Sequence, residues 1–339
     1  MDKWINENYQ ILQILGSGGH GAVYLAQKKK EKLKLSRLFA IKEYKKENLN
    51  LSDFSDEVEI LSHLKHPNIC DIYNAFETES SFKIEMEYIE GCTVREYLEV
   101  VATKNIPFDI GEGLQILAPI IEALIYAHEH EAGAILHKDI CTNNIMISRT
   151  GKVTLIDFGI GQLGNQESKT LQGKPAFLPD LVLSGQKSYS IETDFYSLGV
   201  VAYTLFTGHK IRGEKDIQID NLKDKSIREI LQLLLNYDGD NQKIVELVED
   251  AQFEFRGKLK KTCRLVFDKK FKGEKKIIPK NILKFSFLNF FGYLESFKDE
   301  VDPNQTKIVR RDPPWRKRRI ILGLTVLSFI VFGIIKLIL

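Results

Sequence analysis

Alternating apolar and polar positions run through the first part of the chain. Residues 9–15 (YQILQIL) alternate, lead into a glycine-rich turn and are followed by a second apolar run at 24–26. Further apolar runs stand at 39–42 and 84–89. This alternation is typical of half-buried strands. Residues 54–64 (FSDEVEILSHL) instead repeat at helical spacing, so we expect a small sheet with one helix beside it.

Helical spacing replaces alternation in the middle of the chain. Residues 114–128 form a long apolar helical pattern, and another helix is expected to open at Asp194. A short hairpin is expected between them, at 145–156. Only 17 residues separate Gly208 from Ser226, which leaves room for a short helix or none. The patterns therefore place strands mainly in the first part of the chain and helices mainly in the middle.

The last 20 residues, 320–339, form a continuous apolar run with a single charge, Lys336. As a helix this run would span roughly 30 Å, the thickness of the hydrocarbon core of a bilayer. Six basic residues and one tryptophan lie within 310–319, directly before it, which is a positive-inside signal. We interpret 320–339 as a single-pass transmembrane tail anchor that keeps the rest of the chain in the cytosol. The alternative is a buried core helix.

Charge is sorted along the chain, although its total of +2 is close to zero. Residues 256–319 hold 20 basic and 7 acidic side chains, whereas residues 1–255 hold 27 basic and 39 acidic ones. The small total charge of +2 argues against nucleic acid as a partner of the whole protein. The basic region is expected to lie against anionic membrane lipids, at about 1 kcal/mol per basic residue near the surface. Alternatively, an aromatic helix at 283–297 completes the core and the lysines are only solvated.

Composition and the chain's ends exclude several classes of protein. With 339 residues, 43% of them hydrophobic and 28% charged, the chain is neither disordered nor of low complexity. Its four cysteines stand far apart, which predicts neither a disulfide framework nor a zinc site. The first ten residues are polar, so no secretory signal peptide is expected.

The glycine-rich turn is the first candidate for chemistry. Gly16, Gly18, Gly21 and Val23 form the pattern G-x-G-x-x-G-x-V, and a strand follows it rather than a helix. A flap of this kind lets backbone lie over nucleotide phosphates, where side chains would block close approach. Taken alone, the pattern fits a plain hairpin turn equally well.

Charged residues at the ends of apolar segments supply further candidates. Lys42 ends an apolar strand, and a buried lysine needs a counter-charge, which Glu57 on the following helix could provide. Asp139 and Asn144 precede the hairpin at 145–156 and Asp157 follows it, so the hairpin brings all three to one cleft. Phosphoryl transfer needs such a set: a carboxylate that orients a hydroxyl, and oxygen ligands for Mg²⁺.

Taken in order, these segments closely resemble the motifs of the eukaryotic-type protein kinase family. The motifs are G-x-G-x-x-G-x-V at 16–23, A-I-K at 40–42, a helical Glu57, H-K-D-x-x-x-x-N at 137–144 and D-F-G at 157–159. The resemblance runs from about residue 9 to about residue 250. It implies an α+β, two-lobed kinase fold with a small β-rich N-lobe and a mainly helical C-lobe, to which the chain adds its C-terminal region and transmembrane helix. The expected parts are a kinase N-lobe at 9–88, a C-lobe at 89–255, a juxtamembrane region at 256–319 and the anchor at 320–339.

The resemblance also implies cofactors, partners and roles for single residues. ATP and Mg²⁺ are the implied cofactors, and proteins are the implied substrates. Asp139 is implied as the catalytic base, and Lys42, held by Glu57, as the partner of the α and β phosphates. Asn144 and Asp157 are implied as Mg²⁺ ligands. The implied nucleotide-binding residues are Gly16, Gly18, Gly21, Val23, Ala40, Lys42, Glu87, Ile89 and Met146. Leu61, His137 and Phe158 resemble the hydrophobic stack that couples the lobes.

Two positions depart from the family together. Cys141 stands where serine/threonine kinases usually carry a lysine that approaches the γ-phosphate, and a neutral thiol cannot replace it. Lys174 stands where these kinases usually carry a threonine that contacts that lysine. We hypothesise that Lys174 is catalytic and supplies the missing charge from the activation segment. Alternatively, Lys174 points into solvent and the enzyme is slow or inactive.

We expect a tail-anchored kinase that phosphorylates serine or threonine hydroxyls of proteins at a membrane surface. The serine/threonine preference rests only on the absence of tyrosine-kinase signatures. The alternative is a membrane-anchored pseudokinase that acts as a nucleotide-binding scaffold. A small-molecule kinase should lack the substrate-loop segment at 173–180. The oligomeric state is left open.

Overall fold

A computed structural model describes most of the chain up to Phe255. The residues it describes are 4–6, 9–18, 21–28, 37–46, 51–103, 109–131, 133–158 and 174–255. All of them belong to one compact unit formed by residues 1–276. The predicted juxtamembrane region and tail anchor lie outside the described residues, as does Gly159 of the D-F-G segment.

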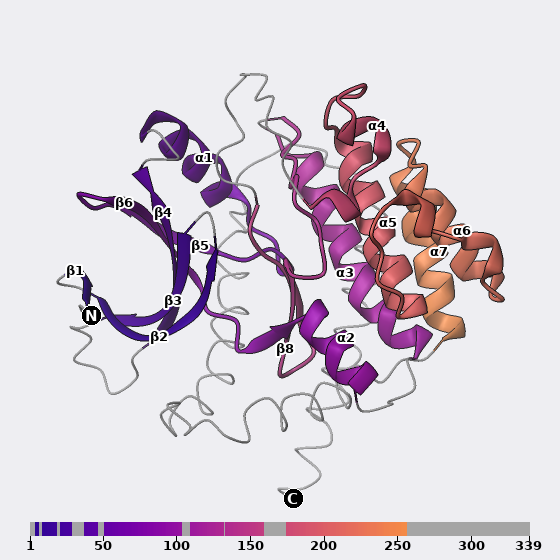
Figure 1. Cartoon of the computed structure of the whole chain (residues 1–339), viewed down its shortest axis with the longest axis horizontal. Coiled ribbons are helices and arrows are strands. Elements are labelled where there is room, and N and C mark those ends of the chain that lie inside the picture. Colours follow the sequence, from indigo (N-terminus) through magenta and orange to yellow (C-terminus); the bar gives the residue numbers. More distant parts are fainter. Residues whose placement is uncertain are drawn as a thin grey trace, which may run out of the picture. The chain divides into compact units, whose positions relative to one another are not determined.

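A six-stranded antiparallel sheet forms the N-terminal part, in the order β1-β2-β3-β4-β6-β5 (Figure 1). Its strands are β1 Trp4–Asn6, β2 Tyr9–Gly18, β3 Gly21–Lys28, β4 Leu38–Lys45, β5 Ile72–Glu77 and β6 Ser81–Glu87. Every strand predicted from alternation is confirmed, and so is the helix, α1 Leu51–His63. Phe54 of α1 joins Tyr44, Phe82 and Ile84 of the sheet in one buried cluster, which fixes the helix against the sheet.

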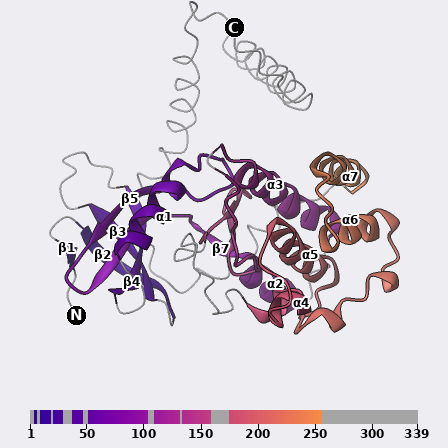
Figure 2. The same ribbon diagram turned by 90° about the horizontal axis from the view of Figure 1, so that it is seen from above.

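Most of the rest of the described chain is helical (Figures 1 and 2). Its helices are α2 Val94–Thr103, α3 Ile110–His128, α4 Asp180–Leu183, α5 Ile191–Thr207, α6 Lys225–Leu235 and α7 Asn241–Glu254. Helix α3 packs against α5 and α7, and α6 packs against both α5 and α7. Among the described helices, α3 is long and apolar enough to cross a membrane, but most of its side chains are buried inside the protein. We therefore interpret α3 as the core helix of this part.

The segment between α5 and α6 is described throughout and contains no α-helix. Two short 3-10 turns occupy it, Glu214–Asp216 and Ile219–Asn221, which confirms the short or missing helix predicted there. Another 3-10 turn, Pro175–Phe177, precedes α4.

A three-stranded sheet of β7 Gly91–Thr93, β8 Ile145–Ser148 and β9 Val153–Leu155 lies beside the connector that leaves β6. Strands β8 and β9 form the predicted hairpin. Its turn is tied to the connector by two ion pairs. Arg149 lies 2.6 Å from Glu90, and Lys152 lies 3.6 Å from Glu87. The Cys70 amide also donates to the Leu155 carbonyl, so β9 is fixed to the segment before β5.

Candidate functional site

The glycine-rich flap is the hairpin between β2 and β3, which pair from Tyr9 and Lys28 out to Gly18 and Gly21. Gly21 has a φ of 141°, and a Cβ there would lie 1.7 Å from the Glu43 carbonyl oxygen. The protein's own backbone therefore requires glycine at this position. Gly16 differs, because a Cβ there would meet no protein atom within 4 Å. Its missing side chain leaves open space above the sheet.

Lys42 on β4 lies next to Val23 of the flap strand and pairs across the other side with Ile84. Its ammonium lies 2.9 Å from Asp157 Oδ1, and both side chains are largely buried. Burial lowers the pKa of Lys42, but Asp157 and Tyr44 together raise that pKa above its ordinary value. Asp157 is therefore the observed partner of Lys42. Glu57 lies on α1, but its side chain is outside the described residues, so its predicted contact with Lys42 stays a prediction.

The loop that carries Asp139 is organised by a buried carboxylate on α5. Asp194 accepts hydrogen bonds from the amides of His137 and Lys138, at 2.8 and 2.9 Å. It also contacts His128 Nε2 at 2.9 Å and accepts from the Tyr189 hydroxyl at 2.9 Å. Burial alone would raise the pKa of Asp194, but its hydrogen bonds with His128 and with the His137 amide hold it below the ordinary value. The carboxylate thus stabilises Lys138 at a positive φ of 62°.

Asp139 and Asn144, which the sequence places at one cleft, contact each other directly. Asn144 Nδ2 donates to the carbonyl oxygen and to Oδ2 of Asp139, both at 2.8 Å. Because the side-chain nitrogen of Asn144 is engaged, its side-chain oxygen Oδ1 is the atom left to coordinate a cation. The other carboxylate oxygen, Asp139 Oδ1, is buried and has no hydrogen-bond partner among the described residues. A buried acceptor of this kind calls for a donor from a bound molecule.

A packed stack joins the D-F-G segment to the catalytic loop. The rings of His137 and Phe158 lie 4.6 Å apart, and Phe158 shares a buried cluster with Leu61 of α1. The contact between His137 and Phe158 agrees with the predicted stack, and Leu61 belongs to the same buried cluster as Phe158. Asp157, directly before Phe158, has a positive φ of 59°, a conformation that aspartate tolerates better than most residues. The stack and this turn direct the Asp157 carboxylate toward Lys42.

The two departures from the family meet in space. Lys174 Nζ donates to Cys141 Sγ at 3.0 Å, and Cys141 is fully buried. Burial, followed by the Asp139 charge, raises the pKa of the Cys141 thiol, while Lys174 opposes them. The sulfur is therefore a neutral acceptor, and the positive charge at this place comes from Lys174. The ammonium points into the loop that carries Asp139 and not into open solvent.

The remaining predicted nucleotide-binding residues lie on both sheets. Ala40 pairs with Leu25 and with Met86, and Met146 on β8 pairs with Thr93. Glu87 ends β6, and Ile89 is buried in the connector.

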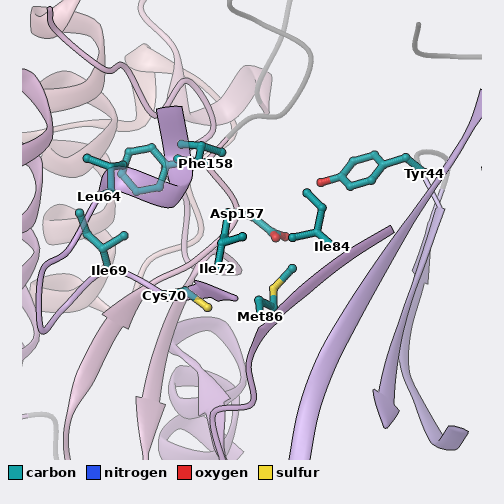
Figure 3. A pocket seen from close by; sticks show the side chains of 10 residues that line it. Tyr44, Leu64, Ile69, Cys70, Ile72, Ile84, Met86, Asp157 and Phe158 are labelled. Atoms are coloured by element: carbon teal, nitrogen blue, oxygen red, sulfur yellow. The ribbon is translucent and has the colours of Figure 1, made fainter. Parts of the chain in front are cut away.

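A pocket opens behind this group, as Figure 3 shows. It is lined by Tyr44, Leu61, Leu64, Ile69, Cys70, Ile72, Ile84, Met86, Asp157 and Phe158.

Two residues of this site were not predicted to act in it. Asp194 was expected only to open a helix, and an aspartate in a first helical turn gives no sequence signal of a buried carboxylate. Tyr44 stands two positions after Lys42 on the same strand, so strand geometry alone places both on one face.

These residues fit ATP and Mg²⁺. Asp139 Oδ1 has no partner among the described residues, Asn144 keeps a carbonyl oxygen, and Gly16 leaves space over the sheet. The described residues contain no group of three or more histidine, cysteine, aspartate or glutamate side chains that could hold a metal. Mg²⁺ would therefore rely on Asn144 and Asp157 together with phosphate oxygens, which is the mode of binding that it favours.

Comparisons with known proteins agree with this geometry. The protein kinase domain family matches residues 9–272. The serine/threonine-protein kinase PrkC of Bacillus subtilis (strain 168) is 35% identical over 227 residues, which are 64% of this chain and 33% of PrkC. The probable serine/threonine-protein kinase PknB of Lactococcus lactis subsp. lactis (strain IL1403) is 28% identical over 214 residues, 61% of this chain and 32% of PknB. The serine/threonine-protein kinase PLK4 of Aedes aegypti is 32% identical over 209 residues, 60% of this chain and 26% of that kinase. The chain thus matches about a third or less of the length of each relative.

Proposed function

Because this chain belongs to the protein kinase family, we propose that it transfers the γ-phosphoryl group of MgATP to serine or threonine hydroxyls of proteins. The observation that carries this proposal is the joint placement of two pairs in one site. Lys42 contacts Asp157 at 2.9 Å, and Asn144 contacts Asp139 at 2.8 Å. These are the cation, the metal ligands and the base that phosphoryl transfer requires.

Each residue has a separate task in this mechanism. Bound MgATP supplies the transferable phosphoryl group. Gly16, Gly18 and Gly21 keep the flap free of side chains over the phosphates, and Lys42 binds the α and β phosphates. Asn144 and Asp157 hold Mg²⁺.

The acceptor hydroxyl is handled by the catalytic loop. Asp139 Oδ1 accepts the hydrogen bond of the substrate hydroxyl and takes its proton as the hydroxyl oxygen bonds to the γ-phosphorus. The bond from that phosphorus to the β–γ bridging oxygen breaks, and ADP leaves. Asn144 holds the other carboxylate oxygen, so the base keeps one orientation.

Lys174 takes the place of the usual catalytic-loop lysine in this proposal. Its contact with Cys141 at 3.0 Å supports this role, because Cys141 lies two residues from Asp139. A cation there stabilises negative charge on the transferring phosphoryl group, and its origin on another segment makes no electrostatic difference.

The proposal includes action at a membrane surface. It is supported by the apolar run at 320–339, which would anchor the chain, and by the excess of 13 positive charges at 256–319, which would bind anionic lipid on the cytosolic side. Substrates are then proteins that reach the same membrane.

Autophosphorylation tests the function directly. The full chain is incubated with MgATP, and phosphorylated serine and threonine are identified by mass spectrometry. We expect phosphate incorporation in the unchanged chain and its loss in Lys42→Met and Asp157→Ala. Equal phosphate incorporation in the unchanged chain and in both variants would contradict the proposed enzyme activity. Binding of ATP without any transfer would favour the pseudokinase alternative, which the neutral thiol of Cys141 motivates.

A further inference from the structure

Helix α7 has one buried face and one exposed face. It lies at the edge of the helical part and packs against α3 and α6 (Figure 2). Ile244, Val248 and Ala251 are buried in the main core. Successive residues of a helix are rotated by about 100°, so the side chains opposite these three point away from the core.

The exposed face carries an aromatic side chain among carboxylates. Glu246, Glu249, Asp250 and Phe253 follow one another at spacings of three, one and three residues, so they form one stripe along the helix. All four are exposed, and Phe253 is 80% exposed. Burial of a phenylalanine side chain is worth about 1.5–3 kcal/mol, which this ring gains only from a partner. We call these four residues the α7 stripe.

The charge of the α7 stripe limits the kind of partner that it fits. Its three carboxylates would be repelled by an anionic membrane surface. The same stripe on a second copy of the chain would be repelled as well, because like charges would face each other. A fitting partner therefore combines positive charge with an apolar side chain that covers Phe253.

The chain supplies such a partner directly after α7, which ends at Glu254. Residues 256–276 hold ten basic and two acidic side chains. Large apolar residues are interleaved with them, at Leu259, Leu265, Val266, Phe267 and Phe271. The match to the protein kinase domain family continues to residue 272, so most of this segment is assigned to the same domain as α7.

Covalent connection favours this segment over a separate basic protein. The chain has only to turn back after Phe255 for residues 256–276 to run along α7, and closure of a short loop costs little entropy. A segment that is held next to its site also acts at an effective concentration that a separate protein does not reach.

We propose that residues 256–276 fold back along the α7 stripe, with basic side chains on its carboxylates and an apolar side chain against Phe253. The same basic side chains would bind anionic lipid, so lipid competes with the α7 stripe for this segment. The docking does not depend on the proposed function. The competition rests on the proposed attraction of the basic region to lipid.

Carbodiimide cross-linking tests the docking. This reagent joins a carboxylate to a lysine amine where the two are in contact, and mass spectrometry identifies the joined residues. The full chain is kept in solution by the neutral detergent dodecyl maltoside. We expect links within one chain, from Glu246, Glu249 or Asp250 to lysines of residues 256–276. Lys65 lies 3.2 Å from Asp71 at the surface, so this pair should be linked in every sample.

Two variants test whether the α7 stripe itself holds the segment. Phe253→Gln keeps every carboxylate and should lower the yield of these links several-fold. The double variant Glu249→Lys, Asp250→Lys should lower the yield of links from Glu246 by a similar factor, because it reverses two of the three charges.

The matched control is the double variant Glu79→Lys, Asp220→Lys. It makes the same change of charge at exposed positions outside α7 and should leave the yield unchanged. Thermal unfolding of every variant is recorded alongside, so that loss of folding is recognised.

Several results would overturn the docking. Links that join only two different chains would place a second copy on the α7 stripe. Links to lysines outside 256–276 would place another segment there. An α7 stripe without links, in samples that contain the link between Lys65 and Asp71, would leave the segment undocked. Unchanged yield in Phe253→Gln would refute the apolar contact.

Added phosphatidylserine tests the competition, and neither measurement uses kinase activity. Micelles of detergent with phosphatidylserine should give several-fold fewer links from the α7 stripe than micelles with phosphatidylcholine. An equal yield with both lipids would overturn the competition and count against the proposed lipid attraction, whereas the docking is decided by the measurement in detergent alone.

Discussion

His137 is held in its neutral form by its own hydrogen bonds. Its Nδ1 accepts from the Asp139 amide at 3.3 Å, so that nitrogen carries no proton. Its Nε2 lies 3.0 Å from the Ile156 carbonyl oxygen and must therefore be the protonated nitrogen. Burial lowers the pKa of His137, although the nearby Asp194 opposes this change. The neutral imidazole ties the catalytic loop to the strand end before Asp157.

A pH dependence of folding follows from His137. As the pH falls below about 6.5, the ordinary histidine pKa, the unfolded chain binds a proton that the folded chain does not bind. The free energy of unfolding therefore drops by up to about 1.4 kcal/mol per pH unit from this residue, until the lowered folded-state pKa is reached. Urea unfolding at several pH values between 7.5 and 5.5 measures this change in the free energy of unfolding.

The variant His137→Phe should be less stable at neutral pH but should lose this part of the slope. His209→Gln changes an exposed histidine and should keep the slope of the unchanged chain. Identical slopes for the unchanged chain and His137→Phe would contradict the assignment.

Lys174 gives a second prediction for a single residue. If its ammonium supplies the charge beside Cys141, Lys174→Ala should lower kcat about a hundredfold, the usual cost of one preorganised contact to transition-state charge. Initial rates of peptide phosphorylation at saturating ATP measure the change. Lys187→Ala removes an exposed lysine and should leave kcat unchanged. The double variant Cys141→Lys, Lys174→Thr restores the usual arrangement and should recover activity. Full activity of Lys174→Ala would refute the role.

At the scale of elements, the flap needs its glycines for two different reasons. Gly21→Ala sets a methyl group against the Glu43 carbonyl oxygen at a positive φ, which should cost about 2 kcal/mol of stability or more. Gly16→Ala meets no protein atom, so the unfolding temperature should stay near that of the unchanged chain. It should still weaken ATP binding, because the methyl group fills space that the phosphates need. Thermal unfolding and ATP titration of both variants separate the two reasons. Similar unfolding temperatures for Gly21→Ala and Gly16→Ala would contradict this distinction between the two glycines.

Local elements of this fold were predictable because their signals are short in sequence. The flap, the helix that carries Glu57 and the hairpin between Asn144 and Asp157 are each encoded within a few residues of the motif. Contacts between distant segments were not predictable in the same way. Asp194 reaches the amide of His137 across 57 positions, and no periodicity encodes that approach. Lys174 and Cys141 are an exception, because both departed from one family contact at once.

The partner of Lys42 shows most clearly which kind of contact a single sequence does not predict. A buried lysine needs a counter-charge, but that rule does not choose between Glu57 and Asp157. The described side chains give Asp157, because the positive φ of that residue turns its carboxylate toward β4. Backbone strain of this kind has no signature in a single sequence.

At the scale of the whole molecule, charge divides the chain into parts that would interact differently with an anionic membrane. Residues 1–255 carry a net charge of −12, and an anionic membrane surface would repel them. Residues 256–319 carry +13 and would be attracted to it. The opposed signs would favour contact of the basic region, rather than of the acidic body, with anionic lipid.

The two proposed modes of membrane attachment differ in their response to salt. Attraction of residues 256–319 to anionic lipid is screened within about 10 Å at 0.1 M salt, whereas an inserted apolar helix is not released by salt. We expect the full chain to sediment with phosphatidylserine vesicles and to resist both 1 M salt and alkaline carbonate. A chain that ends at Arg319 should bind the same vesicles at low salt and leave them at high salt. Replacement of residues 316–319 by glutamine should weaken that low-salt binding. Extraction of the full chain by carbonate would rule out the anchor, because a spanning helix stays in the bilayer.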